Sequence, residues 1–111
     1  MLLLYTTEEQ ESADRGAEWP MWLELNRSLE EAGLLAGTGR LHLTTTATTV
    51  SAISGETELT DGPFAITKEV LVGYYLIEVE NLDQALGVAK RIPLIRYGRV
   101  EVRPVMDLSV E

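Results

Sequence analysis

The sequence predicts an α+β fold in which two helices pack against an antiparallel sheet, in the ferredoxin-like order β-α-β-(hairpin)-β-α-β. Two segments, 20–32 and 82–89, carry apolar residues at helical spacing. Four others have the short apolar or alternating patterns of strands, and a hairpin signal at 54–56 separates the second from the third. The chain of 111 residues suits one core, so we expect a single domain over residues 1–111.

The four predicted strands differ in how much of each is expected to be buried. Residues 2–6 form a short apolar run, and residues 35–46 are rich in threonine, which favours extended structure. Residues 71–80 are apolar at almost every position, as expected of a central strand covered on both faces. Residues 99–105 alternate between apolar and polar, which predicts a half-buried strand.

The helix boundaries have recognisable end signals. Pro20 suits the first turn of the first helix, and Gly33 suits the position just past its end. Asn81 can cap the second helix, with Gln84 three residues later as in a capping box. The polar stretch 8–18 is expected to be a loop or a loosely held helical turn.

The central strand predicts a second copy of the chain. Two helices can cover only one face of the sheet, whereas residues 71–80 are apolar on both sides. A second chain packed on the helix-free face would bury the other side. We therefore expect a homodimer built as a dimeric α+β barrel.

The composition excludes several classes of function. A formal charge of −9 repels phosphate backbones, so we expect no direct nucleic-acid binding. Without cysteine there can be no disulfide, thiolate metal site or cysteine nucleophile. The start of the chain lacks the basic and long apolar regions of a signal peptide, and no stretch is long enough for a membrane span. The expected location is the cytoplasm, with no membrane contact.

The stretch "TDGPF" predicts a rigid corner before the central strand. Proline restricts the preceding Gly62 to extended or positive-φ conformations, which glycine tolerates. Asp61 can accept backbone hydrogen bonds in an Asx-turn, and Phe64 is expected to place its ring in the core. A structural corner alone would account for all four residues.

Several longer motifs carry a family resemblance. The ordered set "TDGPFAITKE", "GYYLIEVENLDQAL", "AKRIP" and "VEVRPV" resembles the YCII-related family, in particular its DGPF-domain branch, over Leu2 to Val105. The resemblance implies a dimeric α+β barrel. It also implies a regulatory or accessory role beside sigma factors of the extracytoplasmic-function type.

The His-Asp pair of the family's founding branch cannot be carried over to this sequence. The founding branch is thought to use a His-Asp pair with the histidine on the first helix, but that helix here, "WPMWLELNRSLEEAG", contains none. This departure argues against a hydrolytic or proton-transfer role of that kind.

The candidate ligand-binding residues lie at the corner and on the later strands. Lys68 could hold an anionic ligand and Asp61 could take a proton; the alternative is an Asx-turn beside a solvated surface pair. Glu78 shares a strand face with Tyr74 by the two-residue period, and Arg103 is its expected ion-pair partner. These three could floor a pocket closed by the second subunit. The alternative is a structural ion pair at the dimer interface.

His42 is a further candidate acid or base, although a lone histidine on a threonine-rich strand is more often only a polar strand residue. No clustered histidines or HxxxH spacing indicate a metal site. No phosphate loop, dinucleotide fingerprint or nucleophile elbow indicates a cofactor or a known reaction. We therefore predict neither a metal nor a cofactor.

Three functions remain open at this point. The first is a non-catalytic or accessory dimeric barrel that binds a small molecule or a protein partner, including a sigma-factor-type regulatory partner. The second is a small enzyme of unknown reaction, with its cleft between the sheet and the partner subunit. The third is a structural interaction module. A cleft filled by side chains would favour the third.

Overall fold

The computed structural model describes residues 1–65 and 67–107 of the chain. Its strands are β1 (Leu2–Thr7), β2 (Leu35–Arg40), β3 (Thr48–Ser51), β4 (Glu58–Asp61), β5 (Glu69–Ile77) and β6 (Arg99–Val102). Its helices are α1 (Glu8–Ser12), α2 (Trp19–Glu31) and α3 (Leu82–Ala89), with 3-10 turns η1 (Gly16–Glu18), η2 (Thr44–Thr46) and η3 (Pro93–Arg96).

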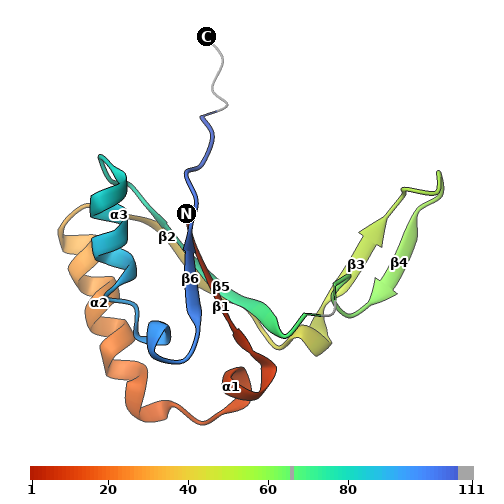
Figure 1. Cartoon of the computed structure of the whole chain (residues 1–111), viewed down its shortest axis with the longest axis horizontal. Helices are drawn as coiled ribbons and strands as arrows, with labels where there is room; N and C mark the ends of the chain where they lie inside the picture. The colour runs from red at the N-terminus through yellow and green to blue at the C-terminus, as the bar shows by residue number, and fades with distance from the viewer. Residues whose placement is uncertain (66, 108–111) are drawn as a thin grey trace.

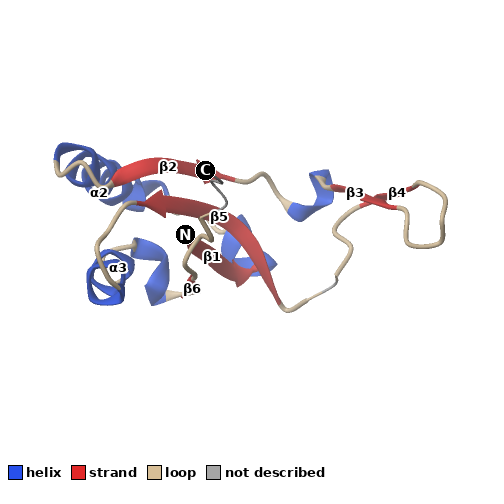
Figure 2. Ribbon diagram, turned by 90° about the horizontal axis from the view of Figure 1, so that it is seen from above, coloured by secondary structure: helices blue, strands red, loops and turns tan. Residues whose placement is uncertain are grey.

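The main sheet has four antiparallel strands in the order β2-β5-β1-β6. Helices α2 and α3 lie together on one side of it, and no helix of the described residues covers the opposite face (Figures 1 and 2). This arrangement confirms the predicted α+β, ferredoxin-like fold.

The core lies between the sheet and the two helices. Alternate residues of β1 point into it, which is why Leu2 and Leu4 are buried while Leu3 and Tyr5 are half-buried on the other face. Both helices bury apolar residues against the sheet: Leu25 and Leu29 from α2, and Ala85, Val88 and Ala89 from α3. The burial expected for Leu82 and Leu86 is wrong, because both are exposed. The buried cluster consists of Leu2, Leu4, Leu25, Leu29, Val70, Val72, Tyr75, Val88, Ala89, Ile92 and Leu94.

The predicted helix ends are confirmed. Gly33 has φ +73° directly after α2, and it donates its N–H to the Glu30 carbonyl at 3.0 Å. Asn81 Oδ1 accepts from Gln84 N at 2.9 Å, and Gln84 Oε1 accepts from the N–H of Glu80 at 2.8 Å. The last bond is made one residue earlier than in a regular capping box.

The second strand is shorter than predicted. It ends at Arg40, and the threonine run that follows forms η2. Thr46 Oγ1 donates to the Leu43 carbonyl at 2.7 Å, and Thr44 Oγ1 donates to Glu8 Oε1 at 2.5 Å. These side-chain hydrogen bonds compete with a strand ladder, which explains why strand propensity alone misplaced the boundary.

The predicted hairpin is present, and it projects away from the sheet. We call β3, β4 and their connecting turn the arm (Figure 1). Val50 pairs with Leu59 across the two strands, so both lie on one face of the arm, and both are exposed. The radius of gyration is 16.2 Å, whereas a compact chain of this length has about 13 Å.

The corner after the arm is partly as predicted. Gly62 has φ +91°, as expected, and its N–H donates to the Ala47 carbonyl at 2.6 Å. Phe64 was expected in the core, and this is wrong: it is 87% exposed, because the corner directly follows the arm, away from the core. Within the described residues, Asp61 is exposed and has no side-chain hydrogen bond to the backbone of an Asx-turn.

Candidate functional site

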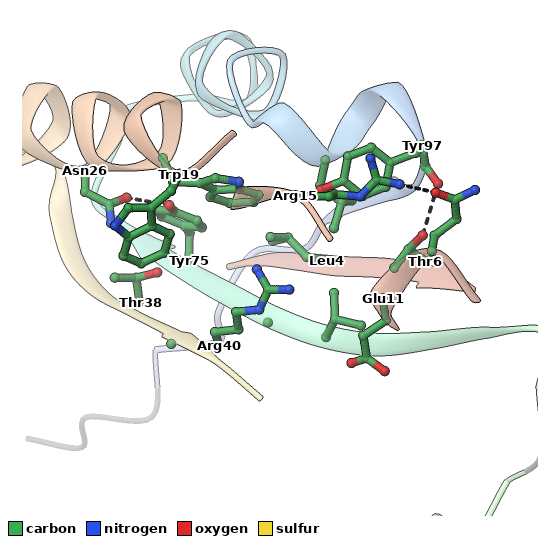
Figure 3. A pocket seen from close by; sticks show the side chains of 16 residues that line it. Leu4, Thr6, Glu11, Arg15, Trp19, Asn26, Thr38, Arg40, Tyr75 and Tyr97 are labelled. Atoms are coloured by element: carbon green, nitrogen blue, oxygen red, sulfur yellow. Dashed lines mark hydrogen bonds between the residues drawn. The ribbon is translucent and has the colours of Figure 1, made fainter. Parts of the chain in front are cut away.

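A cavity of about 200 Å³ lies between the helix-facing side of the sheet, the segment from α1 to the start of α2, and η3. Figure 3 shows Arg40 and Thr38 entering from β2 and Arg15 lying against Tyr97 on the opposite side. The lining residues are Leu4, Thr6, Gln10, Glu11, Arg15, Trp19, Trp22, Asn26, Thr38, Gly39, Arg40, Val72, Gly73, Tyr75, Leu94 and Tyr97.

The wall formed by α1 is set by a helix cap. Thr7 ends β1 in an extended conformation, and its Oγ1 accepts from Gln10 N at 3.2 Å, so the chain turns directly into α1. This turn brings Gln10 and Glu11 over the end of the sheet. Thr6 beneath them is buried, and its hydroxyl donates to the Tyr97 carbonyl at 3.0 Å.

The aromatic wall is held in place by hydrogen bonds that its side chains donate to one carboxylate. Glu18 Oε1 accepts from Trp22 Nε1 at 2.8 Å and from the Tyr97 hydroxyl at 2.7 Å. Trp22 stacks on Tyr75, with ring centroids 6.4 Å apart and 16° between the planes, and the Tyr75 hydroxyl donates to Asn26 Oδ1. The orientations of these rings are therefore fixed before any ligand arrives.

Both tyrosines of this wall stay protonated at neutral pH. Burial, followed by the hydrogen bond to the Glu18 carboxylate, raises the pKa of Tyr97 to about 12. Burial also raises the pKa of Tyr75. Each hydroxyl is therefore a hydrogen-bond donor in the site.

Two guanidinium groups reach the cavity, and neither is fully satisfied. Arg15 lies over the Tyr97 ring, with Cζ 3.5 Å from the centroid, and donates to Gln10 Oε1, but its Nε is buried without an acceptor. Within the described part of the chain, the Arg40 side chain makes no hydrogen bond or ion pair, although its main chain pairs with β5. The lining thus holds unused donors and two positive charges.

Glu11 is the cavity's one acidic side chain, and its Oε2 is buried without a hydrogen-bond donor among the described residues. Burial, aided by the like charge of Glu8, raises the pKa of Glu11 above its usual value of 4.5, while Arg40 opposes the shift. The folded chain thus binds this proton more tightly than the unfolded chain. Glu11 therefore lowers stability as the pH rises above about 4.5.

The described residues contain neither a metal-binding cluster nor a helix that could span a membrane. They contain no group of three or more histidine, aspartate or glutamate side chains arranged to hold a metal ion. None of the helices in these parts of the chain combines the length and the apolar character needed to cross a bilayer.

Comparison with known proteins places the sequence in a family. Residues 1–109 match the YCII-related domain. The chain belongs to the YCII-related family. It is also similar to an uncharacterised protein of Rhizobium meliloti (strain 1021), at 45% identity over 83 residues, which make up 73% of this chain and 67% of the relative.

In this YCII-related chain, the predicted Glu78–Arg103 pair is not formed. Strand β5 ends at Ile77, so Glu78 lies past the strand end and is exposed instead of buried. The ion pair of Arg103 is with Glu101, Nε to Oε2 at 3.7 Å, and both side chains are largely exposed. The expectation of a buried pair within one chain is therefore wrong, while pairing with a partner chain's arginine stays a prediction.

Glu78 and Arg103 nevertheless line one groove, away from the first cavity and beside Pro104 and Val105. Its lining contains no buried side-chain atom without a partner in the described residues, unlike the first cavity. Tyr74 lies on the helix-free face, as the two-residue period predicts, and its ring packs over Gly39. The three residues therefore do not form one pocket floor in the single chain.

The other three candidates lie on or near the arm. Asp61 ends β4 and Lys68 precedes β5, and both are exposed. His42 is exposed in the loop that follows β2, not on the strand as predicted. None of them lines the cavity, and whether they bind a ligand stays a prediction.

The cavity residues of this YCII-related chain were missed by motif reasoning. They come from six elements or their flanks, namely β1, α1, α2, β2, β5 and η3. No short pattern links Arg15 to Arg40 or Trp22 to Tyr97. One signal was available: both tryptophans of the chain occur in the first turn and a half of α2.

Proposed function

We propose that the chain binds a small molecule in this cavity, as a non-catalytic or accessory member of its family. The observation that carries the proposal is a pair of unsatisfied polar atoms, Glu11 Oε2 and Arg15 Nε, buried in the walls of a cavity otherwise rich in aromatic side chains. Buried polar groups are normally paired, so unpaired ones facing a preformed cavity support a missing ligand.

Intrinsic fluorescence offers a direct test, because both tryptophans of the chain, Trp19 and Trp22, line the cavity. We expect single-ring compounds with polar substituents to change this fluorescence and to raise the melting temperature, since a ligand that binds only the folded state stabilises it. Free N-acetyltryptophanamide titrated with the same compounds is the control. If no such compound binds below about 1 mM, a weak limit for a specific ligand, the small-molecule proposal fails.

A second candidate function is catalysis. It is favoured by Glu11, whose raised pKa and unpartnered oxygen are common in acid–base catalysts. Such a group could transfer a proton to or from a bound ligand. NMR of bound compounds after prolonged incubation with the protein separates the two functions, because an enzyme converts the compound and a binding domain leaves it unchanged.

We further propose that the chain forms a homodimer through the helix-free face. In support, Leu3 and Tyr74 pair on that face, as do Tyr5 and Leu71, so it carries an apolar patch that no helix covers. Four strands about 4.8 Å apart and roughly 20 Å long give about 400 Å² on each subunit, or about half of a standard 1,600 Å² interface in total.

The arm supports the same proposal, because it can supply the missing area. Its apolar side chains are exposed, with Ile53 98% accessible to solvent, and a two-stranded hairpin is barely stable without further packing. A second copy has both the arm and the uncovered face, so two copies related by a two-fold axis can cover each other. We propose that each arm packs on the partner subunit.

Sedimentation tests the dimer and the arm separately. The wild-type chain should sediment as a dimer at micromolar concentration, and changing both Val50 and Leu59 to serine should weaken dimerisation about tenfold or more. Leu82→Ser is the control, since Leu82 is equally exposed but lies on α3. A monomeric wild type would contradict the homodimer, whereas a dimer unaffected by the double change would contradict only the role of the arm.

Three finer assignments remain proposals that the sequence supports. The ordered motifs around "TDGPFAITKE" favour the DGPF-domain branch of the family. That branch favours a regulatory role with a sigma-factor-type protein partner, in the cytoplasm. Co-purification of the chain with such a sigma factor, lost when the arm is deleted, is the expected result; no association would contradict it.

A further inference from the structure

The cavity has a chemical character that narrows its ligand. We infer that it takes a small single-ring carboxylate that also carries a hydroxyl or amino group. The inference rests on the proposed small-molecule function and names the ligand class for that site. It follows from three properties of the lining, which are its charge, its walls and its unpaired acceptor.

The charge of the lining selects an anion. The chain has a net charge of −9, yet this cavity contains two guanidinium groups and one carboxyl group, whose pKa is raised. Arg40 has no ion-pair partner in the described residues, and Arg15 Nε lacks an acceptor. A planar guanidinium matches a carboxylate well, because two parallel N–H groups can donate to its two oxygens.

The walls select a flat apolar body behind that charge. Trp22, Tyr75 and Tyr97 are held in fixed orientations, and Leu4, Val72 and Leu94 complete the apolar lining. A free phosphate or sulfate would leave these surfaces without contact. At about 200 Å³ the cavity is smaller than the roughly 300–1,000 Å³ of drug-sized pockets, so a single ring fits better than a fused system.

The unpaired acceptor selects a donor on the ligand. Glu11 Oε2 is buried, and no described residue donates a hydrogen bond to it. Arg40 influences it by charge without being in hydrogen-bond contact. A ligand hydroxyl or amino group would satisfy this oxygen, while the carboxylate of the same ligand would satisfy the arginines.

Calorimetric titration at pH 7 with seven ring compounds tests each property. Hydroxybenzoates with the hydroxyl at each ring position are compared with benzoate and with the matching hydroxybenzamides. We expect the best hydroxybenzoate to bind at least about tenfold more tightly than its amide, because only the acid makes charge-assisted hydrogen bonds. It should also bind more tightly than benzoate, which has no donor for Glu11.

Two variants assign these preferences to residues. Arg40→Met should remove most of the preference for the acid over the amide, whereas Arg27→Met should not, because Arg27 is exposed and paired with Glu24 outside the cavity. Glu11→Met should remove the preference for hydroxybenzoate over benzoate. The same variant should keep the preference for the acid over the amide.

The outcomes separate this inference from the function on which it rests. If the amides bind as tightly as the acids, the ligand class is wrong, although a small-molecule site remains. The same follows if Arg40→Met keeps the full preference for the acid over the amide. Equal binding of benzoate and hydroxybenzoate would overturn the role of Glu11. Absence of binding by every compound, charged or neutral, would overturn the inference together with the proposed function.

Discussion

Replacing Gly98 with alanine is expected to lower the free energy of unfolding by about 3 kcal/mol. A Cβ atom at this position would lie 2.3 Å from the Tyr5 carbonyl oxygen, 2.7 Å from Leu94 Cδ2 and 3.0 Å from Thr6 Cβ. The closest of these is main chain in β1, which pairs with β6 and cannot move aside without disturbing the sheet. Tyr97 would also move, and with it one wall of the cavity.

Gly87→Ala is the matched control for that change. Gly87 lies inside α3, and its Cβ would meet nothing within 4 Å. Alanine should stabilise the helix there by about 0.5–1 kcal/mol. Urea denaturation of both variants measures the difference, and equal stability of Gly98→Ala and wild type would show that β1 and η3 do not approach as closely as described.

Leu29→Ala is expected to cost about 2–5 kcal/mol, because it removes a buried side chain and leaves a void between α2 and the sheet. Leu29 is only 1% exposed and belongs to the main core cluster. Leu23 on the same helix is 50% exposed, so Leu23→Ala should cost about 1 kcal/mol or less.

The same change should weaken the site. Helix α2 carries Trp22 and Asn26, whose contacts with Tyr75 form part of the cavity wall. Denaturation midpoints report the stability of the variant. The tryptophan fluorescence of its native state reports changes in the cavity wall. If Leu29→Ala is as stable as Leu23→Ala, α2 does not pack against the sheet in the way described.

The fold could be predicted because its signals are local. Apolar spacing located α2 and α3, the cap residues Gly33 and Asn81 marked helix ends, and the short apolar run at 2–6 located β1. The error at Phe64 has a different origin. Phe64 was expected in the core because it is aromatic, but it directly follows the arm, and its ring is exposed.

The candidate site could not be predicted because it is assembled from distant segments. Glu78 was grouped with Tyr74 by the strand period, but β5 ends before Glu78, and a sequence pattern locates strand ends poorly. The importance of Arg15 and Arg40 depends on which partners they lack. That property exists only in three dimensions, since it concerns every donor and acceptor around them.

The proposed ligand site is the cavity between α1, α2 and the sheet. Proton–nitrogen NMR tests it most directly, using the indole N–H signals of Trp19 and Trp22 and the Nε–H signals of the arginines. On titration with a hydroxybenzoate, we expect saturable shifts for both indoles, Arg15 and Arg40, with Arg103 unchanged. Shifts at Arg103 or in the arm, without any at the two indoles, would contradict it.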